Sequence, residues 1–441
     1  MVPETGTAAA GAAAAEPSAR SAELLAPAGG LAQLQAALDA GADAVYLGLR
    51  GLNMRAAAAA NFDEAGLREA SARCRDRGKK LYLTLNAIVF DGELRAVGRT
   101  LDLAAPLVDA VLASDWGVVA ACRARGVPWH ASTQMSCANA EAARFLASQG
   151  ARRIVLAREC SMREVAGIAK EMRALGVEIE VFVHGAQCVA ESGRCFLSHQ
   201  AYGASASRGE CQQPCRRPYV FAREVPAEGS ERAAAEFSVG AHTIFSARDL
   251  CSLPFLDRIV AAGAASLKIE GRGRPAEYVR AVVSAYREAL DAVLAGRFSP
   301  ERAAPLVERC AAVYHRRFGE GLFHGRPGAK QFTDNDENLA TRVKRHVGVV
   351  ERDWPRAGMA QIRVQDRAFR VGDTLCVQGP RTGDATFEVS SIRHDDEVWD
   401  EARKGDWCTV PRPSPVRPGD RVYAVVPRPA AIRSGISGES C

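Results

Sequence analysis

The chain has 441 residues, of which 47% are hydrophobic and 25% are charged, as in an ordinary globular protein with a sizeable core. No hydrophobic run approaches the roughly 18–20 residues that cross a bilayer, so the sequence predicts no membrane-spanning helix. The net charge of +5, from 57 basic and 52 acidic residues, is too small to identify a nucleic-acid-binding protein.

The N-terminal segment 1–22 is rich in alanine but lacks the basic region and the large aliphatic core of a secretory signal. We therefore expect a disordered tail and a cytoplasmic protein. The 13 cysteines do not suggest a disulfide framework in that compartment. Cysteines that cluster in the sequence indicate a metal site instead.

From Glu23 onward, short apolar runs alternate with longer amphipathic stretches, a pattern typical of βα units on a parallel sheet. The predicted strands are Glu23–Pro27, Ala44–Leu47, Lys80–Asn86, Ala110–Ala113, Trp129–Gln134, Arg153–Ala157, Glu178–Val183 and Ser266–Glu270. Eight strands with intervening helices over about 250 residues predict an α/β fold, a TIM-like (β/α)8 barrel over residues 23–328.

Active sites of such barrels lie at the C-terminal ends of the strands. Polar side chains are predicted to converge there, although any one of them alone is more often structural. The candidate substrate-binding residues among them are Tyr46, Asn86, Gln134, Arg158 and Arg274.

The last predicted strand runs into the sequence KIEGRGR, where Lys268, Glu270 and Arg272 alternate and so share one face. Charges inside a barrel are costly unless they are paired, which favours a catalytic or anion-binding trio. Arginine suits a substrate that carries carboxylates or phosphates. His184, at the end of the seventh strand, is a candidate general acid or base, or merely bonds a backbone carbonyl.

Four cysteines, Cys188, Cys195, Cys211 and Cys215, lie in an insertion expected over residues 185–265, after the seventh strand. Thiolates are soft ligands, and iron–sulfur clusters tolerate irregular spacing. A structural zinc site fits the wide first gap poorly, and chance clustering without a metal is the remaining alternative. We favour an iron–sulfur cluster, with Cys251 as a reserve ligand.

Beyond a predicted linker over 329–346, period-two strands over 347–430 predict a small antiparallel β-barrel, followed by a tail over 431–441. It resembles the second domain of translation GTPases. Such modules position RNA or a protein partner, or only pack against the rest of the chain.

Several blocks in order resemble peptidase family U32, the collagenase-like proteins: ELLAPAG from Glu23, EVFVHGA from Glu180, RGEC from Arg208, SARDLC from Ser246 and SLKIEGR from Ser266. The resemblance implies a TIM-barrel catalytic domain. In several branches it also implies an iron–sulfur cluster, of the 4Fe–4S type here, and oxygen-independent hydroxylation. Those branches include prephenate-dependent hydroxylases of a tRNA wobble uridine or a 23S rRNA cytidine, and ubiquinone-ring hydroxylases.

The four cysteines match those of the RNA-modifying branches, and the close partner Cys215 favours RNA over ubiquinone. We therefore expect an RNA base hydroxylase with RNA as its partner, no membrane partner, and prephenate as a candidate co-substrate. A collagenase-like peptidase, a ubiquinone-ring hydroxylase subunit and a non-catalytic RNA-binding factor are the alternatives. The sequence leaves the target nucleotide and the oligomeric state open.

Overall fold

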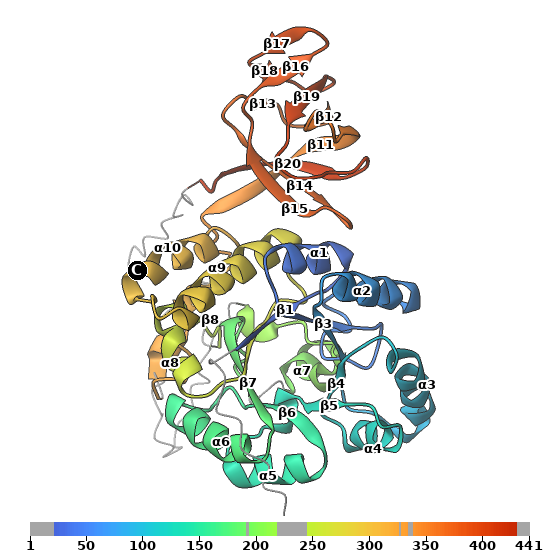
Figure 1. Ribbon diagram of the computed structural model, residues 1–441, viewed down its shortest axis with the longest axis vertical. Coiled ribbons are helices and arrows are strands. Elements are labelled where there is room, and N and C mark those ends of the chain that lie inside the picture. The colour runs from blue at the N-terminus through green and yellow to red at the C-terminus, as the bar shows by residue number, and fades with distance from the viewer. Residues whose placement is uncertain (1–21, 191–193, 218–244, 326–327, 334–337, 430–441) are drawn as a thin grey trace, which may run out of the picture.

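The computed structural model describes residues 22–190, 194–217, 245–325, 328–333 and 338–429. It has two domains, a helix-ringed barrel and a smaller all-β domain (Figure 1). The tails predicted over 1–22 and 431–441 lie outside the described residues, apart from Ala22.

Eight parallel strands form the barrel. They are β1 (Glu23–Pro27), β2 (Ala44–Gly48), β3 (Lys80–Leu85), β4 (Ala110–Ala113), β5 (Trp129–Ala131), β6 (Ala151–Val155), β7 (Glu178–Gly185) and β9 (Ser266–Ile269). Neighbours pair in chain order, and β9 pairs with both β7 and β1, which closes the sheet. The predicted TIM-like barrel is confirmed.

Helices surround the barrel and bury its outer face (Figure 1). They are α1 (Leu31–Asp39), α2 (Glu64–Asp76), α3 (Leu94–Ala104), α4 (Trp116–Ala124), α5 (Ala140–Ser148), α6 (Met162–Ala174), α8 (Leu256–Ala261), α9 (Ala276–Leu294) and α10 (Pro300–Ala311). Asp63, Asp115 and Asn139 cap α2, α4 and α5 by accepting backbone N–H groups. Among the described helices, none combines the length and the hydrophobicity that crossing a bilayer requires.

The connection from β7 to β9 carries the cysteine segment. Its described part contains α7 (Leu197–Tyr202), two 3₁₀ turns at Ala206–Arg208 and Pro214–Arg216, and the short strand β8 (Asp249–Cys251), which precedes α8. β8 pairs antiparallel with the end of β7 and parallel with β10 (Phe318–Gly319). The segment is thereby tied to the C-terminal end of the barrel strands, where the mouth lies.

The C-terminal domain is antiparallel, as predicted. Its main sheet has the order β15-β14-β20-β11-β12-β19-β16-β17, and β13 (Phe369–Arg370) pairs separately with β18 (Glu401–Ala402). The strands of the sheet are β11 (Arg342–Trp354), β12 (Met359–Val364), β14 (Thr374–Gly379), β15 (Gly383–Glu388), β16 (Ile392–His394), β17 (Glu397–Trp399), β19 (Trp407–Pro411) and β20 (Arg421–Pro427).

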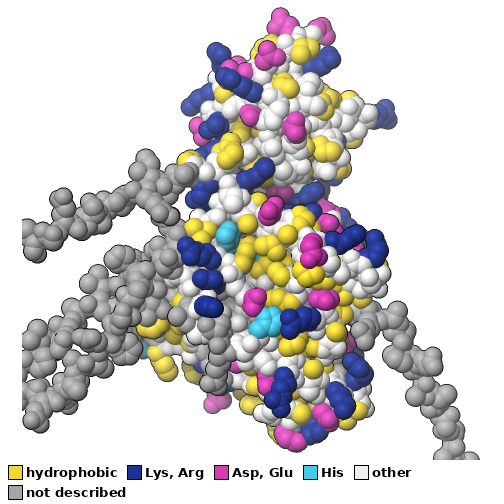
Figure 2. Space-filling view, turned by 90° about the vertical axis from the view of Figure 1, so that its left-hand side faces the viewer, with side chains coloured by type: hydrophobic (Ala, Val, Ile, Leu, Met, Phe, Trp, Pro, Cys, Tyr) yellow, Lys and Arg dark blue, Asp and Glu magenta, His cyan; other side chains and the backbone are white. Residues whose placement is uncertain are grey.

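This domain has its own core, which includes Val347, Ile362, Leu375 and Val422. β11 already begins at Arg342, inside the segment expected as a linker, because its ladder with β20 extends to the pair Arg342 and Pro427. Strand β15 packs against α1 and α9 of the barrel. On the face shown in Figure 2, basic side chains gather around the waist between the two domains.

Candidate active site

A network of charged side chains lies inside the barrel, toward the N-terminal ends of its strands. Arg153 on β6 forms ion pairs with Glu23 at 2.5 Å and with Glu180 at 3.2 Å, and Lys268 on β9 lies 2.7 Å from Glu180. Burial alone would raise the pKa of Glu180, but Lys268 and Arg153 lower it. Lys268 is therefore held by a buried carboxylate, with its Nζ 4.6 Å from the ring centroid of Tyr46.

A second group of charged side chains lies closer to the mouth, at the C-terminal end of β9. Glu270 accepts from Arg55 Nε and Nη2 at 3.2 and 2.8 Å, and Arg272 donates to Asn53 Oδ1 at 2.9 Å. Burial would raise the pKa of Glu270, but Arg55 and the nearby Arg158 lower it to about 2. The carboxylate thus stays ionised and fixes the Arg55 guanidinium at the mouth.

Asn86, Gln134 and Arg158 complete the rim. Asn86 Nδ2 donates to Ser132 Oγ at 3.2 Å and to Gln134 Oε1 at 3.1 Å. Arg158 donates to the carbonyl of Ala186 at 2.6 Å, and its Cζ lies 3.9 Å from the centroid of the Phe182 ring. Three of the five predicted substrate-binding residues therefore lie together at the mouth, and their part in binding stays a prediction.

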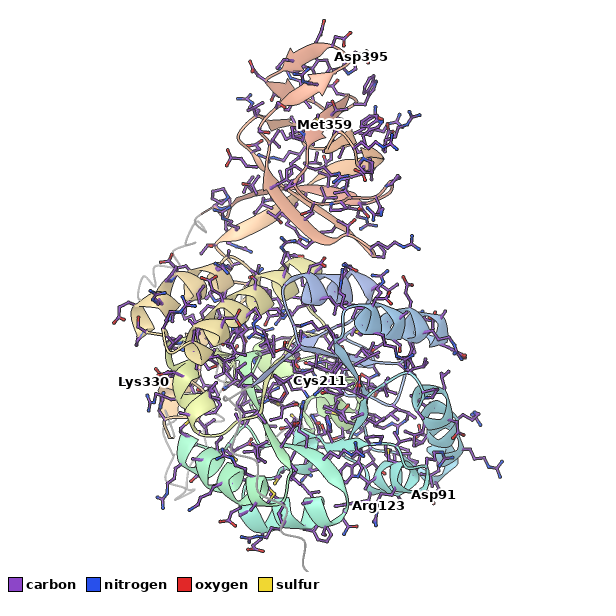
Figure 3. The ribbon with its side chains drawn as sticks, in the orientation of Figure 1. Asp91, Arg123, Cys211, Lys330, Met359 and Asp395 are labelled. Atoms are coloured by element: carbon purple, nitrogen blue, oxygen red, sulfur yellow. The ribbon has the colours of Figure 1, made fainter. Side chains whose placement is uncertain are left out.

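All four clustered cysteines face one cavity of about 100 Å³ at this mouth. The same cavity is lined by Arg55, Gln134 and Arg158, and Figure 3 shows Cys211 near the centre of the ring of helices. The cysteines are free thiols, with Cys188 exposed and the other three partly exposed. Burial and the neighbouring thiols raise the pKa of Cys215, although Arg216 opposes them.

Two anchors hold the cysteine segment over the mouth. Buried Arg216 donates to the carbonyls of Gln187 and Ala247. Gly209 has φ +86°, and a Cβ there would lie 2.0 Å from the carbonyl oxygen of Asn53, so only glycine permits this close approach. The segment is thus packed onto the loop that carries Arg55.

The donor set fits a soft metal centre by type and number, since four thiolates suit an iron–sulfur cluster or zinc. Within the described residues, no group of three or more Cys, His, Asp or Glu side chains is already arranged to hold a metal ion. The four thiols line the same cavity, and those of Cys188, Cys195 and Cys211 contribute to the raised pKa of Cys215.

His184 lies at the end of β7, as predicted, but away from the rim residues, and its role as a general acid or base stays a prediction. The pairing of β7 with β9 shifts register between Phe182 and His184, which turns the imidazole out of the lumen. The ring packs against Tyr278 and Tyr286 of α9, and burial together with His315 lowers its pKa to about 3. His184 does not line the cysteine cavity.

Seven further predicted residues do not line the cavity: Tyr46, Asn86, Cys251, Lys268, Glu270, Arg272 and Arg274. Cys251, predicted as a reserve ligand, is buried beside Tyr286, where burial raises its pKa to about 11, and it does not line the cavity of the other four cysteines. Tyr46 lies deeper in the barrel and donates to the carbonyl of Ile269 at 2.9 Å. Arg274 stacks on Tyr314, with its Cζ 3.6 Å from the ring centroid, in a cleft between the domains.

Sequence reasoning missed Arg55, the cation that pairs with Glu270 and lines the cavity. It follows β2 in the loop LNMRAAAAA, whose alanine-rich composition does not mark a site. Its place after a predicted barrel strand was the signal that could have found it.

A family model described as peptidase family U32 matches residues 29–333 of this barrel and its cysteine segment. The chain belongs to peptidase family U32. The kinship predicted from the sequence blocks is therefore confirmed, as is the prediction that this U32 chain is an enzyme.

Named relatives of this U32 chain fall into two groups. A collagenase of Porphyromonas gingivalis is 35% identical over 410 residues, covering 91% of this chain and 97% of that protein. The tRNA hydroxylation protein P1 of Bacillus subtilis is 32% identical over 383 residues, covering 86% and 87%. A 23S rRNA 5-hydroxycytidine synthase of Escherichia coli is 35% identical over 313 residues, covering 69% of this chain and 46% of that protein.

Proposed function

We propose that this U32 chain hydroxylates a base in RNA, using an iron–sulfur cluster bound by Cys188, Cys195, Cys211 and Cys215. The observation that carries the proposal is that these four free thiols line a single cavity at the barrel mouth. Two of the relatives above are named for RNA hydroxylation, one on tRNA and one on 23S rRNA.

The cluster, when bound, would supply the redox chemistry of the reaction. Arg55 and Arg158 would bind carboxylates, because guanidinium groups at a partly enclosed site recognise them in a bidentate manner. Prephenate, which carries two carboxylates, is the co-substrate that we propose. Glu270 would orient Arg55, and Phe182 would support the Arg158 guanidinium through its ring face.

The amides of Asn86 and Gln134 offer hydrogen-bonding groups to a base that enters the mouth. Both amides belong to one network with Ser132, which fixes their orientation. Unpaired bases are commonly recognised in proteins through hydrogen bonds to their polar edges. This network would therefore position the base beside the cysteine cavity.

Proteolysis is the second candidate function, because the Porphyromonas relative is named a collagenase. The match covers 91% of this chain and 97% of that relative. A cysteine nucleophile would need a base within hydrogen-bond reach. The described residues that line the cavity include no histidine, aspartate or glutamate. Chelator-sensitive cleavage of gelatin by the pure protein, lost in Cys211→Ala, would favour the peptidase.

Nucleoside mass spectrometry of bulk tRNA and rRNA tests the hydroxylase directly. A strain that lacks this chain should lose one hydroxylated nucleoside, and the wild-type chain should restore it. Cys211→Ala should fail to restore it, whereas Cys251→Ala should succeed, because Cys251 does not line the cavity. An unchanged nucleoside profile in the strain without the chain would refute the proposed function.

A further inference from the structure

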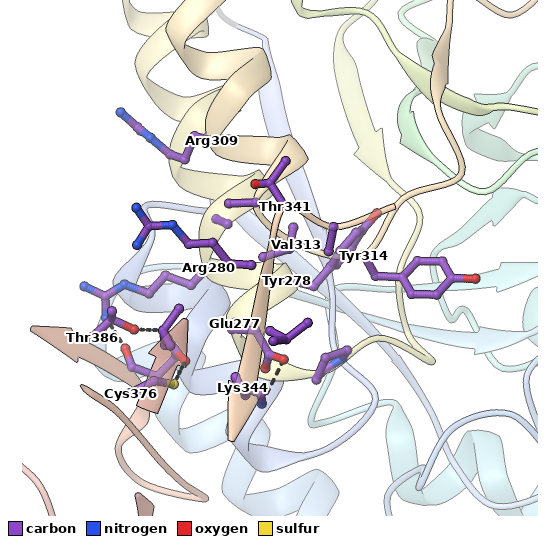
Figure 4. A pocket seen from close by; sticks show the side chains of 18 of the residues that line it. Glu277, Tyr278, Arg280, Arg309, Val313, Tyr314, Thr341, Lys344, Cys376 and Thr386 are labelled. Atoms are coloured by element: carbon purple, nitrogen blue, oxygen red, sulfur yellow. Dashed lines mark hydrogen bonds and ion pairs between the residues drawn. The ribbon is translucent and has the colours of Figure 1, made fainter. Parts of the chain in front are cut away.

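A cleft of about 910 Å³ lies between the barrel and the C-terminal domain, separate from the cysteine cavity. Its walls come from α9 and α10 on one side and from β11, β14 and β15 on the other (Figure 4). Figure 4 shows Arg280 on α9 and Arg309 on α10 reaching toward the same side, while Lys344 on β11 faces Glu277.

Positive charge predominates in the lining of this cleft. Six cationic side chains and three carboxylates line it; they are Arg274, Arg280, Arg309, Arg342, Lys344 and Arg428 against Glu277, Glu308 and Asp384. Glu277 is occupied by Lys344 at 2.8 Å, and Asp384 accepts from Gln378 at 2.7 Å and Thr386 at 3.1 Å.

Three of these arginines present their charge outward. Arg309, Arg342 and Arg428 are exposed, and they come from both domains. Arg309 also pairs with Glu288 at 3.0 Å, but both side chains are open to water, which screens the pair. The basic side chains seen at the waist in Figure 2 agree with this concentration of charge. These cations are spread along a groove that both domains line. Such a spread suits an extended polyanion better than a small anion.

Side-chain contacts link the cleft to the barrel mouth. Arg274, four residues after Glu270, stacks on Tyr314, and the Cζ of Arg316 lies 5.1 Å from the centroid of the same ring. Arg316 in turn donates to Gln213 Oε1 at 3.1 Å, and Gln213 lines the cysteine cavity. A chain of arginine and tyrosine side chains therefore leads from the cleft to the cavity.

We propose that this interdomain cleft binds the sugar-phosphate backbone of the substrate RNA, away from the base that is modified. The inference rests on the proposed function, because it takes RNA as the substrate of the neighbouring mouth. It assigns the C-terminal domain a direct part in substrate binding. Backbone contacts position a nucleic acid without reading its sequence, so the cleft would set affinity and the mouth would set specificity.

Fluorescence anisotropy with a labelled oligoribonucleotide of about 20 nucleotides measures this binding without any need for turnover. The test variant is the full chain with Arg309→Gln and Arg342→Gln, which removes one charge from each wall. The matched control carries Arg123→Gln and Arg152→Gln, two exposed arginines near the C-terminal end of α4 and the start of β6, at the far end of the barrel.

The cleft variant should bind the RNA at least about tenfold more weakly than wild type. The slope of the logarithm of the binding constant against the logarithm of the salt concentration should become shallower by about 0.7 per lost phosphate contact. The control variant should keep the wild-type affinity and slope. In turnover, the cleft variant should raise KM for the long RNA and leave kcat unchanged. Equal affinities of the cleft variant, the control and the wild type would overturn the cleft proposal alone.

Two other outcomes show whether the proposed function or only the nature of the cleft's ligand is wrong. A wild-type chain that binds no RNA at all would refute the proposed function together with the cleft. If adenosine monophosphate or inorganic phosphate displaces the RNA at concentrations comparable to the RNA itself, then the cleft is a site for a small anion, and the backbone proposal is wrong.

Discussion

Arg153 forms ion pairs with three carboxylates of the barrel. Its side chain is 2% exposed and contacts Glu23, Glu178 and Glu180, of which Glu180 is fully buried. Taking a guanidinium out of water is costly, and only close carboxylates offset that cost. The network is thus stable as a whole and intolerant of the loss of one member.

Replacement of Arg153 by leucine should lower the free energy of unfolding by about 3–5 kcal/mol, because buried carboxylates would lose their counter-charge. Urea denaturation measures the difference. Arg144→Leu is the matched control, since Arg144 also contacts two glutamates but lies on the surface, where solvent screens the pairs. Equal losses in the two variants would show that burial of the network is not the source of its contribution.

Individual site residues were predictable where the chain itself marked them. The four cysteines and the charged run from Lys268 to Arg272 stand out by type and spacing, and the structure brings the cysteines to one cavity. Arg55 was missed, because only its place after a barrel strand marked it, and its contact with Glu270 spans 215 positions of the chain. Arg274 was misplaced because the chain leaves the mouth after Arg272 and enters the cleft.

At the scale of elements, the barrel strands were readable because both faces of each strand are buried and the turns are sharply marked. The direction of the side chains at the end of β7 could not be predicted. Simple alternation from Glu180 through Phe182 would place His184 in the lumen, but the register shift sends it to the outside. A bulge of this kind depends on the pairing partner, which one strand's sequence does not reveal.

His184→Asn should therefore keep RNA hydroxylation within a few-fold of wild type, while it loses stability through poorer packing. The pKa of the buried imidazole is lowered from 6.5 to about 3, so the unfolded chain binds a proton that the folded chain does not. Stability from this group falls as the pH drops from about 6.5 to about 3, by about 1.4 kcal/mol per pH unit.

Urea denaturation of His184→Asn at a series of pH values should show a shallower decline over this window than wild type does. Loss of hydroxylation by more than about a hundredfold in the folded variant would return His184 to the catalytic residues. The measurement thus separates a packing role from a chemical one.

At the scale of the whole molecule, the two domains meet where β15 packs on α1. Gly383, at the start of β15, has φ +69°, and a Cβ there would lie 2.8 Å from the backbone nitrogen of Ala36. The contact leaves no room for a side chain. Correct docking of the C-terminal domain, and hence the shape of the cleft, depends on this glycine.

Gly383→Val should loosen the docking and expose the junction to proteases. The matched control is Gly358→Val, because Gly358 has a similar φ of +65° but a Cβ added to it would meet nothing within 4 Å. Backbone strain of about 1–2 kcal/mol is thus common to both variants. Limited proteolysis should cut the first variant faster between the domains, and equal rates would contradict the role assigned to the contact.

We propose that the cysteine cavity holds an iron–sulfur cluster that serves RNA hydroxylation. Its most direct test is the iron, sulfide and zinc content of the full chain purified without oxygen, together with its visible absorbance. If the cluster is present, the protein should be brown, with about four iron and four sulfide per chain, both lost in Cys211→Ala and retained in Cys251→Ala. A colourless wild-type protein with one zinc per chain would contradict it.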